Sequence, residues 1–158
     1  MRFLWIAVLT VVAAAAACGY LIWDMQDGGD DTVRVTEDVT EGRMVLYIDG
    51  TAVDTEWEDN DSVRALRSLA KDGVTVEASG YGGFEQWGGL GSRLPSADRN
   101  INAKPGDIML YRSENIVVFC GTNTYSYTRL GKVISPSGDA LTEMLDKDRV
   151  TFRIVIEN

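Results

Sequence analysis

The sequence predicts a mainly β protein built as a closed antiparallel barrel of about eight short strands with two short helices. Short apolar, β-branched runs recur from Met44 to Asn158, and turn signals separate them about every ten residues. Two stretches within this part have helical spacing instead. Residues 1–23, which are almost without charge, and the acidic residues 24–43 precede this part and show neither the strand-like runs nor the amphipathic helical spacing. A two-sheet sandwich is the alternative fold.

Residues 1–23 are predicted to be a hydrophobic helix. The 21 residues from Phe3 to Trp23 carry no charge, and a helix of that length would span about 30 Å, the thickness of a bilayer's hydrocarbon core. Arg2 before the run and acids after it orient the N-terminus to the cytoplasm and the rest of the chain to the other side.

Three fates of this N-terminal segment stay open. It is an uncleaved signal anchor, a signal peptide cut after Ala17, or a lipoprotein signal in which Cys18 carries the lipid. Ala16-Ala17-Cys18 resembles a lipobox, but the apolar run continues past the cysteine through Trp23. We therefore favour an anchor over lipidation, and either over release. The expected location is the cell membrane, with the remainder of the chain extracytoplasmic.

Residues 24–43 are predicted to be an acidic flexible linker, because they contain seven acidic residues against two arginines and few apolar side chains. The acids from Asp24 to Asp31 lack the spacing of a calcium-binding loop, so a solvated spacer is the better interpretation. The barrel domain is then expected over residues 44–158.

The barrel is expected to begin with a hairpin followed by a helix. Residues 44–48 and 51–57 are strand-like and flank Asp49-Gly50, a strong hairpin signal. Residues 62–71 have apolar positions at helical spacing, with N-cap candidates before them and Gly73 placed to end the helix.

The middle of the domain is expected to alternate strands and loops. Residues 74–79 read as a strand. The Gly-rich and aromatic run 80–91 reads as a loop or irregular strand, because it lacks the lysine and the spacing of a phosphate-binding loop. A long polar loop is expected over residues 96–104.

A buried hairpin is predicted at the centre of the domain. Residues 106–111 and 116–121 are apolar runs without clean alternation, separated by four polar residues. After it we expect a polar aromatic connection over 122–127, a short strand over 129–134, a short helix from Asp139 to Leu145 and a last strand over 150–156.

Composition excludes several classes of function. The net charge of −9 opposes the phosphate backbone, so no nucleic-acid partner is expected. The chain has no histidine, the commonest general base and metal ligand, and its two cysteines, Cys18 and Cys120, form no metal-binding pattern. We expect no metal and no cofactor. Cys120 lies on an apolar strand and is expected to pack as a buried thiol.

Several short segments resemble the bacterial cyclophilin-like domain family, whose members are mostly uncharacterised. They occur in the family's order between Met44 and Asn158: Asp59-Asn60, Leu94-Pro95, 106–111, 117–121 and 130–133. The resemblance implies an eight-stranded cyclophilin-like barrel but no particular activity. True cyclophilins isomerise prolyl bonds with a central Arg and a His. Here the His is absent and only Arg93, beside the aromatic run, stands as a candidate for that Arg.

Aromatic residues around one carboxylate are the candidate binding site. Aromatics with one or two polar groups suit a peptide or small-molecule pocket. The candidates are Tyr81, Phe84, Glu85, Trp87, Tyr111 and Tyr127, with Tyr125 in the same segment as Tyr127. Glu85 has no second carboxylate to form an acid–base pair with it.

Two functions follow from these observations. The first is a membrane-anchored extracytoplasmic module that binds a peptide or small ligand without catalysis, its other partner being the membrane. The second is a peptidyl-prolyl isomerase using Arg93, whose guanidinium would stabilise a twisted amide. A barrel that acts only as a surface spacer is a third possibility, and a concave groove lined by the aromatics would count against it.

Overall fold

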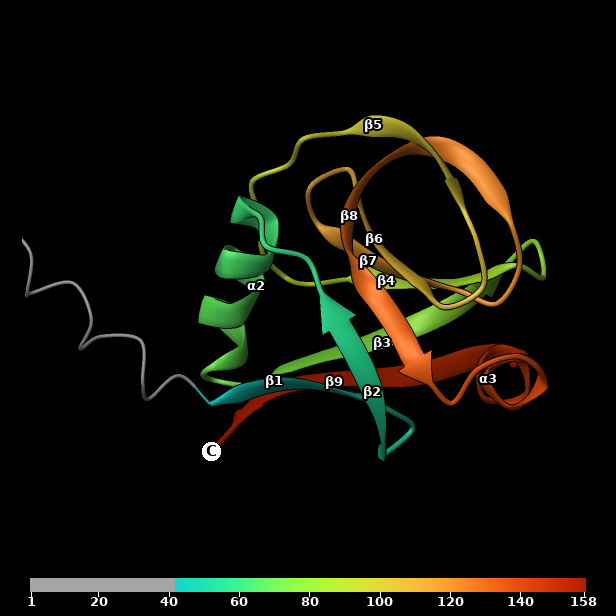
Figure 1. The fold of residues 1–158 in the computed structure, drawn as a ribbon, viewed down its shortest axis with the longest axis horizontal. Helices are drawn as coiled ribbons and strands as arrows, with labels where there is room; N and C mark the ends of the chain where they lie inside the picture. The colour runs from blue at the N-terminus through green and yellow to red at the C-terminus, as the bar shows by residue number, and fades with distance from the viewer. Residues whose placement is uncertain (1–41) are drawn as a thin grey trace, which may run out of the picture. The chain divides into compact units, whose positions relative to one another are not determined.

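Nine strands and two helices form residues 42–158, the part of the chain that this computed structural model describes (Figure 1). In chain order they are β1 (Arg43–Ile48), β2 (Thr51–Trp57), α2 (Asp61–Ala70), β3 (Val74–Tyr81), β4 (Glu85–Gly89), β5 (Arg99–Ala103), β6 (Asp107–Tyr111), β7 (Asn115–Phe119), β8 (Asn123–Ser135), α3 (Asp139–Leu145) and β9 (Arg149–Glu157). The helix expected over residues 1–23, and the linker up to residue 41, lie outside the described residues. Among residues 42–158 no helix is long and apolar enough to cross a membrane.

Eight of the strands close into an antiparallel ring. The order is β2-β1-β9-β3-β4-β7-β6-β8, and β8 returns to pair with β2. The ninth strand, β5, pairs with β8 alone, at Asn123 to Tyr127. Because β8 is 13 residues long, it can pair in turn with β5, β6 and β2. The predicted closed barrel with two short helices is confirmed.

The ring closes at a glycine. Gly131 of β8 is paired with Trp57 of β2, and a Cβ atom at position 131 would overlap the carbonyl oxygen of Glu56. The indole Nε1 of Trp57 donates a hydrogen bond to the carbonyl oxygen of Met44, 3.0 Å away, on neighbouring strand β1. Close approach of β2 and β8 therefore depends on the missing side chain at Gly131.

The central hairpin of β6 and β7 is apolar on both faces because it packs against two cores. On one face, the side chains of Ile108, Leu110, Ile116 and Val118 join the main barrel core. On the other, Met109, Val117 and Phe119 join a smaller cluster that also contains Ala103 and Tyr127. Successive strand residues point to opposite faces, so burial on both sides explains the missing polar alternation.

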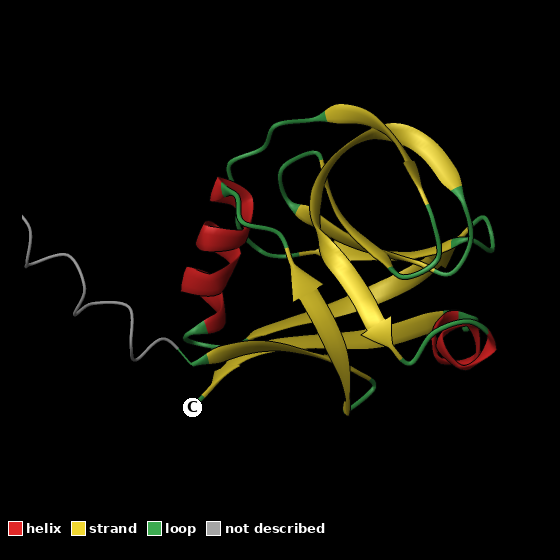
Figure 2. Ribbon diagram, viewed as in Figure 1, coloured by secondary structure: helices red, strands yellow, loops and turns green. Residues whose placement is uncertain are grey.

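The two helices stand at opposite ends of the barrel ribbon (Figure 2). In α2, Asn60 is the N-cap and its side-chain oxygen accepts a hydrogen bond from the amide of Val63 at 2.9 Å. Its buried residues Val63, Leu66 and Ala70 belong to the main core. In α3, Leu141 and Leu145 are the buried residues.

Two loop predictions are wrong. The polar stretch 96–104 contains β5, and the expected connection 122–127 is the first part of β8. These segments pair with each other, from Arg99 opposite Tyr127 to Ala103 opposite Asn123. β5 is held by hydrogen bonds to β8, a partner about 24 residues away in sequence. Because both segments are polar, their local composition did not indicate strands. The Gly-rich run 80–91 contains β4, as the irregular-strand alternative expected.

Candidate functional site

A hollow of about 570 Å³ lies over the smaller hydrophobic cluster. We term it the aromatic pocket. It is lined by Tyr81, Phe84, Glu85, Trp87, Tyr111, Arg112, Asn123, Tyr125 and Tyr127. All six binding candidates from the sequence are among these residues. The structure therefore brings them together, although they come from β3, β4, β6, β8 and the turns beside them.

Strand register explains why these side chains share one face. Residues directly opposite each other in an antiparallel pair point to the same side. Glu85 on β4 is paired with Tyr81 on β3 and with Phe119 on β7. Trp87, two residues on, is paired with Val117. Since Phe119 and Val117 belong to the smaller cluster, Glu85 and Trp87 point to that side and away from the main core.

Three tyrosines form one wall of the pocket. The ring centroids of Tyr111, Tyr125 and Tyr127 lie 5.9 to 6.1 Å from one another. Tyr127 also makes an edge contact with Phe119, 5.5 Å between centroids, and is only 3% exposed. On the other wall Tyr81 meets Phe84 edge-on at 5.8 Å. These contacts fix ring orientations without filling the hollow.

Exposed large hydrophobic side chains gather at the mouth of the pocket. Among the described residues the exposed large hydrophobic side chains are Tyr81 (60%), Tyr125 (52%), Ile134 (49%) and Trp87 (38%). Three of these four line the aromatic pocket. Gathering of exposed apolar side chains at one hollow is typical of a binding surface.

Glu85 is the acidic residue among those that line the pocket, and one of its two carboxylate oxygens lacks a hydrogen-bond partner. Its Oε2 atom is buried, and no group among residues 42–158 forms a hydrogen bond with it. Burial raises the pKa of the Glu85 carboxyl to about 7, and hydrogen bonding with Tyr127 acts in the opposite direction. A carboxyl group with this environment exchanges its proton near neutral pH.

Tyr127 and Asn123 flank Glu85 as neutral polar groups. The Asn123 side-chain nitrogen donates to the Tyr127 hydroxyl oxygen at 2.9 Å. Burial, followed by the nearby Glu85 charge, raises the pKa of Tyr127 to about 12. The Tyr127 hydroxyl therefore keeps its proton at neutral pH and serves as a donor in the pocket.

The sequence predictions missed Arg112 and Asn123. Arg112 lies in the turn between β6 and β7 with φ of 52°, and its guanidinium stands 5.0 Å from the centroid of the Tyr111 ring. It makes no ion pair with Glu85 in the described structure. The sequence shows that Arg112 directly follows Tyr111. It does not show the turn conformation that places the Arg112 side chain at the pocket.

The other sequence candidates lie elsewhere. Arg93 lines a separate shallow hollow with Glu114, and its Nη1 lies 3.4 Å from the Glu114 Oε2. Cys120 is partly rather than fully buried, and burial raises the pKa of its thiol. Cys18, the lipidation candidate, lies outside the described residues.

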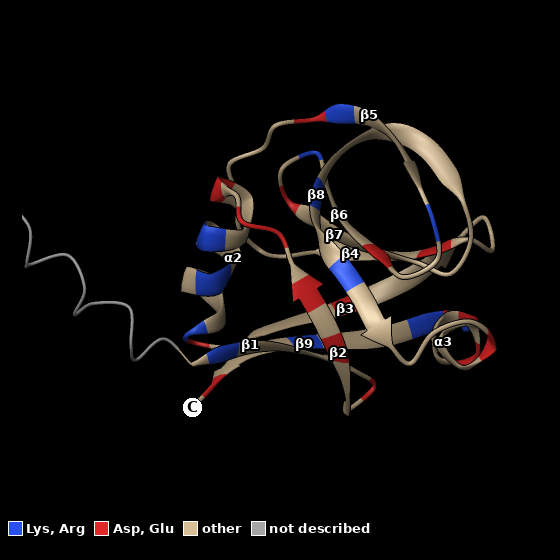
Figure 3. Ribbon diagram, in the orientation of Figure 1, with Lys and Arg blue, Asp and Glu red and all other residues tan. Residues whose placement is uncertain are grey.

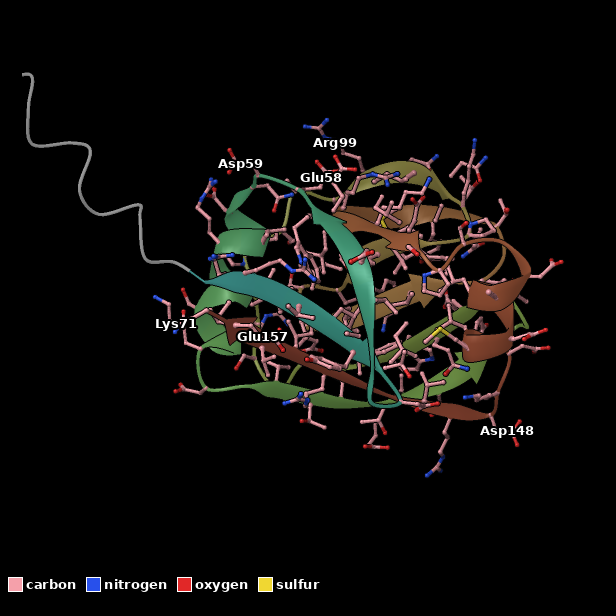
Figure 4. All side chains as sticks on the ribbon, turned by 60° about the horizontal axis from the view of Figure 1, so that its bottom comes forward. Glu58, Asp59, Lys71, Arg99, Asp148 and Glu157 are labelled. Carbon is pink, nitrogen blue, oxygen red and sulfur yellow. The ribbon has the colours of Figure 1, made fainter. Side chains whose placement is uncertain are left out.

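A second hollow of about 530 Å³, the polar cleft, lies beside the N-terminus of α2. Its lining residues are Glu58, Asp59, Asn60, Asp61, Ser62, Pro95, Ser96, Ala97, Arg99, Asn100, Ile101, Thr128 and Arg129. Glu58, Asp59 and Arg99 project from the same edge of the molecule (Figure 4). Basic and acidic residues are interspersed over the ribbon as a whole (Figure 3).

Two polar side chains that line this cleft, Thr128 and Arg129, bind groups of the surrounding protein. Thr128 donates to the Asp98 carboxylate at 2.6 Å and accepts from the amide of Ala97 at 2.9 Å. Arg129 pairs with the buried Asp107, 3.0 Å from Nη1 to Oδ1. These bonds connect Ala97, Asp98 and Asp107 to β8 and form a structural network beside the cleft.

Neither hollow is built as a metal centre. Within residues 42–158 no group of three or more carboxylate or thiol side chains is placed to hold a metal ion.

Comparison with protein families gave one match. The family model described as the cyclophilin-like family matches residues 46–157, which include every strand except the start of β1. No curated protein and no solved structure matches the chain.

Proposed function

Because the chain belongs to the cyclophilin-like family, whose fold leaves the activity open, we propose that it is a non-catalytic binding module. Its ligand is a peptide or another small molecule, and the aromatic pocket is the binding site. We further propose that residues 1–23 anchor the module in the cell membrane, with the barrel on the extracytoplasmic side.

One observation carries the binding proposal. Three of the four exposed large hydrophobic side chains, Tyr81, Trp87 and Tyr125, surround a single hollow of about 570 Å³. Exposing these rings costs free energy unless a ligand covers them. The hollow is within the size range of small-molecule and peptide sites, and it counts against a barrel that serves only as a spacer.

The absence of catalysis is supported by the surroundings of Glu85. No second carboxylate lines the aromatic pocket to form an acid–base pair with it. The neighbouring phenol of Tyr127 holds its proton up to a pKa of about 12. Binding through rings and hydrogen bonds needs neither group to transfer a proton.

The binding proposal is tested with full-length protein in maltoside micelles and a set of fluorescently labelled short peptides. Tyr125→Ala removes an exposed pocket ring, and we expect it to weaken the tightest peptide by at least about tenfold. Ile134→Ala is the matched control, since Ile134 is equally exposed, lies on the same strand β8 and does not line the pocket. Equal effects of the two substitutions would contradict the assignment.

The location is tested separately. We expect the protein to stay in the membrane pellet after alkaline extraction, and the barrel to be cut by protease added outside intact cells. Cys18→Ala distinguishes a lipid anchor from a helical anchor by the mass of the membrane-bound protein. If Cys18 carries the lipid, the substitution blocks removal of the residues before it and the mass rises; a helical anchor keeps nearly the same mass. Recovery in the soluble fraction without treatment would contradict anchoring.

Peptidyl-prolyl isomerisation is the second candidate, favoured by one observation. A guanidinium, that of Arg112, lies at the edge of the aromatic pocket and could stabilise a twisted prolyl amide. Acceleration of X-Pro isomerisation, which takes tens of seconds uncatalysed, and its loss in Arg112→Ala would replace the binding module by an enzyme. Loss in Arg93→Ala alone would instead support the arginine named from the sequence.

A further inference from the structure

We propose that the ligand of the aromatic pocket carries a cationic N–H group, such as the ammonium or guanidinium end of a Lys or Arg side chain in a peptide, and that this group binds Glu85. The inference rests on the proposed binding function and specifies the chemistry of its ligand.

The first step is the unpartnered Glu85 oxygen. Oε2 is buried and accepts no hydrogen bond from any described residue. A buried acceptor without a donor costs about 1–3 kcal/mol. The Glu85 side chain lines the aromatic pocket, so a donor from a ligand can reach this carboxylate once the side chain turns its buried Oε2 toward the hollow.

The second step is that the protein's own nearby cation does not satisfy Glu85. Arg112 lies over the Tyr111 ring, with its guanidinium carbon 5.0 Å from the ring centroid, and it forms no ion pair with Glu85. The groups that interact electrostatically with Glu85 are the Tyr127 phenol and the Cys120 thiol. A carboxylate in such surroundings is stabilised most by a positive charge that brings its own N–H donors.

The third step is the aromatic lining. Faces of Tyr and Trp rings attract cations within about 6 Å of the centroid, and Arg112 on Tyr111 is an instance of that contact in this pocket. Tyr125, Trp87 and Tyr81 present further rings at the mouth. A quaternary ammonium would use the rings but could not donate to Oε2. A group with N–H bonds uses both, and an anion would be repelled by Glu85.

Proton exchange at Glu85 should make binding of a cationic ligand depend on pH. Of the titratable and charged groups near Glu85, Tyr127 from β8 and Cys120 after β7 interact with it. Tyr81 from β3, Tyr111 from β6, Tyr125 from β8 and Arg112 line the same pocket. The pKa values of Tyr127 and Cys120 are both raised, so these two groups stay neutral near pH 7. Glu85 is then the group that exchanges its proton there, since its pKa is about 7. A cation binds the ionised form, so affinity rises with pH up to about 8, and binding at pH 7 releases about half a proton.

The test measures calorimetric binding of three peptides to the full-length chain in maltoside micelles. Acetyl-Gly-Lys-Gly amide carries the cation, acetyl-Gly-norleucine-Gly amide is its neutral equivalent, and acetyl-Gly-Glu-Gly amide carries the opposite charge. We expect the Lys peptide to bind at least about tenfold more tightly than the norleucine peptide. Repeating the titration in phosphate and in Tris measures the released proton from the difference in heat.

Two variants make the test specific. Glu85→Gln should abolish both the preference for the Lys peptide and the proton release. Glu56→Gln, an exposed glutamate on β2 outside both hollows, should leave both unchanged. The comparison of the three peptides on the unaltered chain needs no variant, so a folding defect in Glu85→Gln cannot decide the result.

Two further outcomes distinguish failure of the cationic-ligand proposal from failure of the proposed binding function. Equal affinity for the Lys and norleucine peptides, or tighter binding of the Glu peptide, would overturn the cationic ligand and leave the binding module standing. Failure of all three peptides to bind, together with no binding in the labelled peptide set, would overturn the binding module and the inference with it.

Discussion

The two hollows of this barrel are nearly equal in volume but differ in the pairing of the polar side chains that line them. The polar cleft holds about 530 Å³ and the aromatic pocket about 570 Å³. In the cleft, Thr128 and Arg129 have protein partners for their polar side chains. In the pocket, the Oε2 atom of Glu85 has none among the described residues.

The difference teaches that volume does not mark a binding site. A satisfied network stabilises the fold and gives a ligand little to gain. An unsatisfied carboxyl group among exposed rings lowers stability and leaves interactions for a ligand to make. Removal of the Asp107 carboxylate beside the cleft and of the Glu85 carboxylate in the pocket should therefore change stability in opposite directions.

The largest expected effect is in the polar cleft network. Asp107→Ala removes the buried carboxylate that pairs with Arg129 and accepts from the amide of Lys104 at 2.9 Å. We expect the free energy of unfolding to fall by about 3 kcal/mol, the low end for a broken buried pair, because Arg129 is one-third exposed and lies near Glu58. Urea unfolding measures this. An unchanged midpoint would mean that the network is not structural.

The aromatic pocket should respond in the opposite sense. The pKa of Glu85 rises from 4.5 to about 7 on folding. The folded state therefore binds this proton more tightly, and stability is lost as pH rises from about 4.5 through 7. Glu85→Gln should match the wild type near pH 4 and be more stable near pH 8 by about 1–2 kcal/mol, allowing for the partial exposure of the carboxyl. Urea unfolding at each pH measures this difference. A difference between the two proteins that does not change with pH would contradict a raised pKa at Glu85.

A smaller effect is expected at the neighbour of Glu85. Tyr127→Phe removes the hydroxyl whose hydrogen bonding lowers the pKa of Glu85, so that pKa should rise above 7, and stability should fall by about 1 kcal/mol. Carboxyl-carbon NMR titration follows the pKa directly. Tyr47→Phe is the control, because its hydroxyl bonds Glu157 outside the pocket. A lower pKa of Glu85 in Tyr127→Phe would show that the Tyr127 hydroxyl does not stabilise the ionised Glu85.

The smallest effect is expected at Arg93. Its ion pair with Glu114 is solvent-exposed, with 69% of the Arg93 side chain accessible. Arg93→Ala should change the free energy of unfolding by less than about 0.5 kcal/mol and leave peptide affinity unaltered. A large loss of affinity would show that this shallow hollow, rather than the aromatic pocket, contacts the ligand.

Much of the pocket could be predicted because several of its aromatic residues lie close together in the sequence, and such a cluster indicates a binding site. Tyr81, Phe84 and Trp87 stand within seven residues around Glu85, so any hairpin there brings them close together. Tyr127 is harder to place, because the sequence predicts a connection over 122–127 where β8 begins. Arg112 and Asn123 escaped because isolated polar residues next to turns carry no periodic signal.

The amino-acid sequence by itself determined the local structure. Asp49-Gly50 turns the first hairpin with φ of 47° and 80°, Asn60 caps α2, and the apolar runs of β6 and β7 form the central hairpin. Each depends on residues within a few positions of one another, where propensity and spacing act.

Only the tertiary structure decided three features. They are the closure of β2 against β8 at Gly131, the addition of β5, and the burial of the Glu85 oxygen away from any partner. All three depend on segments that are distant along the chain, since Glu56 meets Lys132 and Glu85 lies across from Phe119. Periodicity says on which side of a strand a residue points, whereas burial and pairing depend on which distant strand lies beside it.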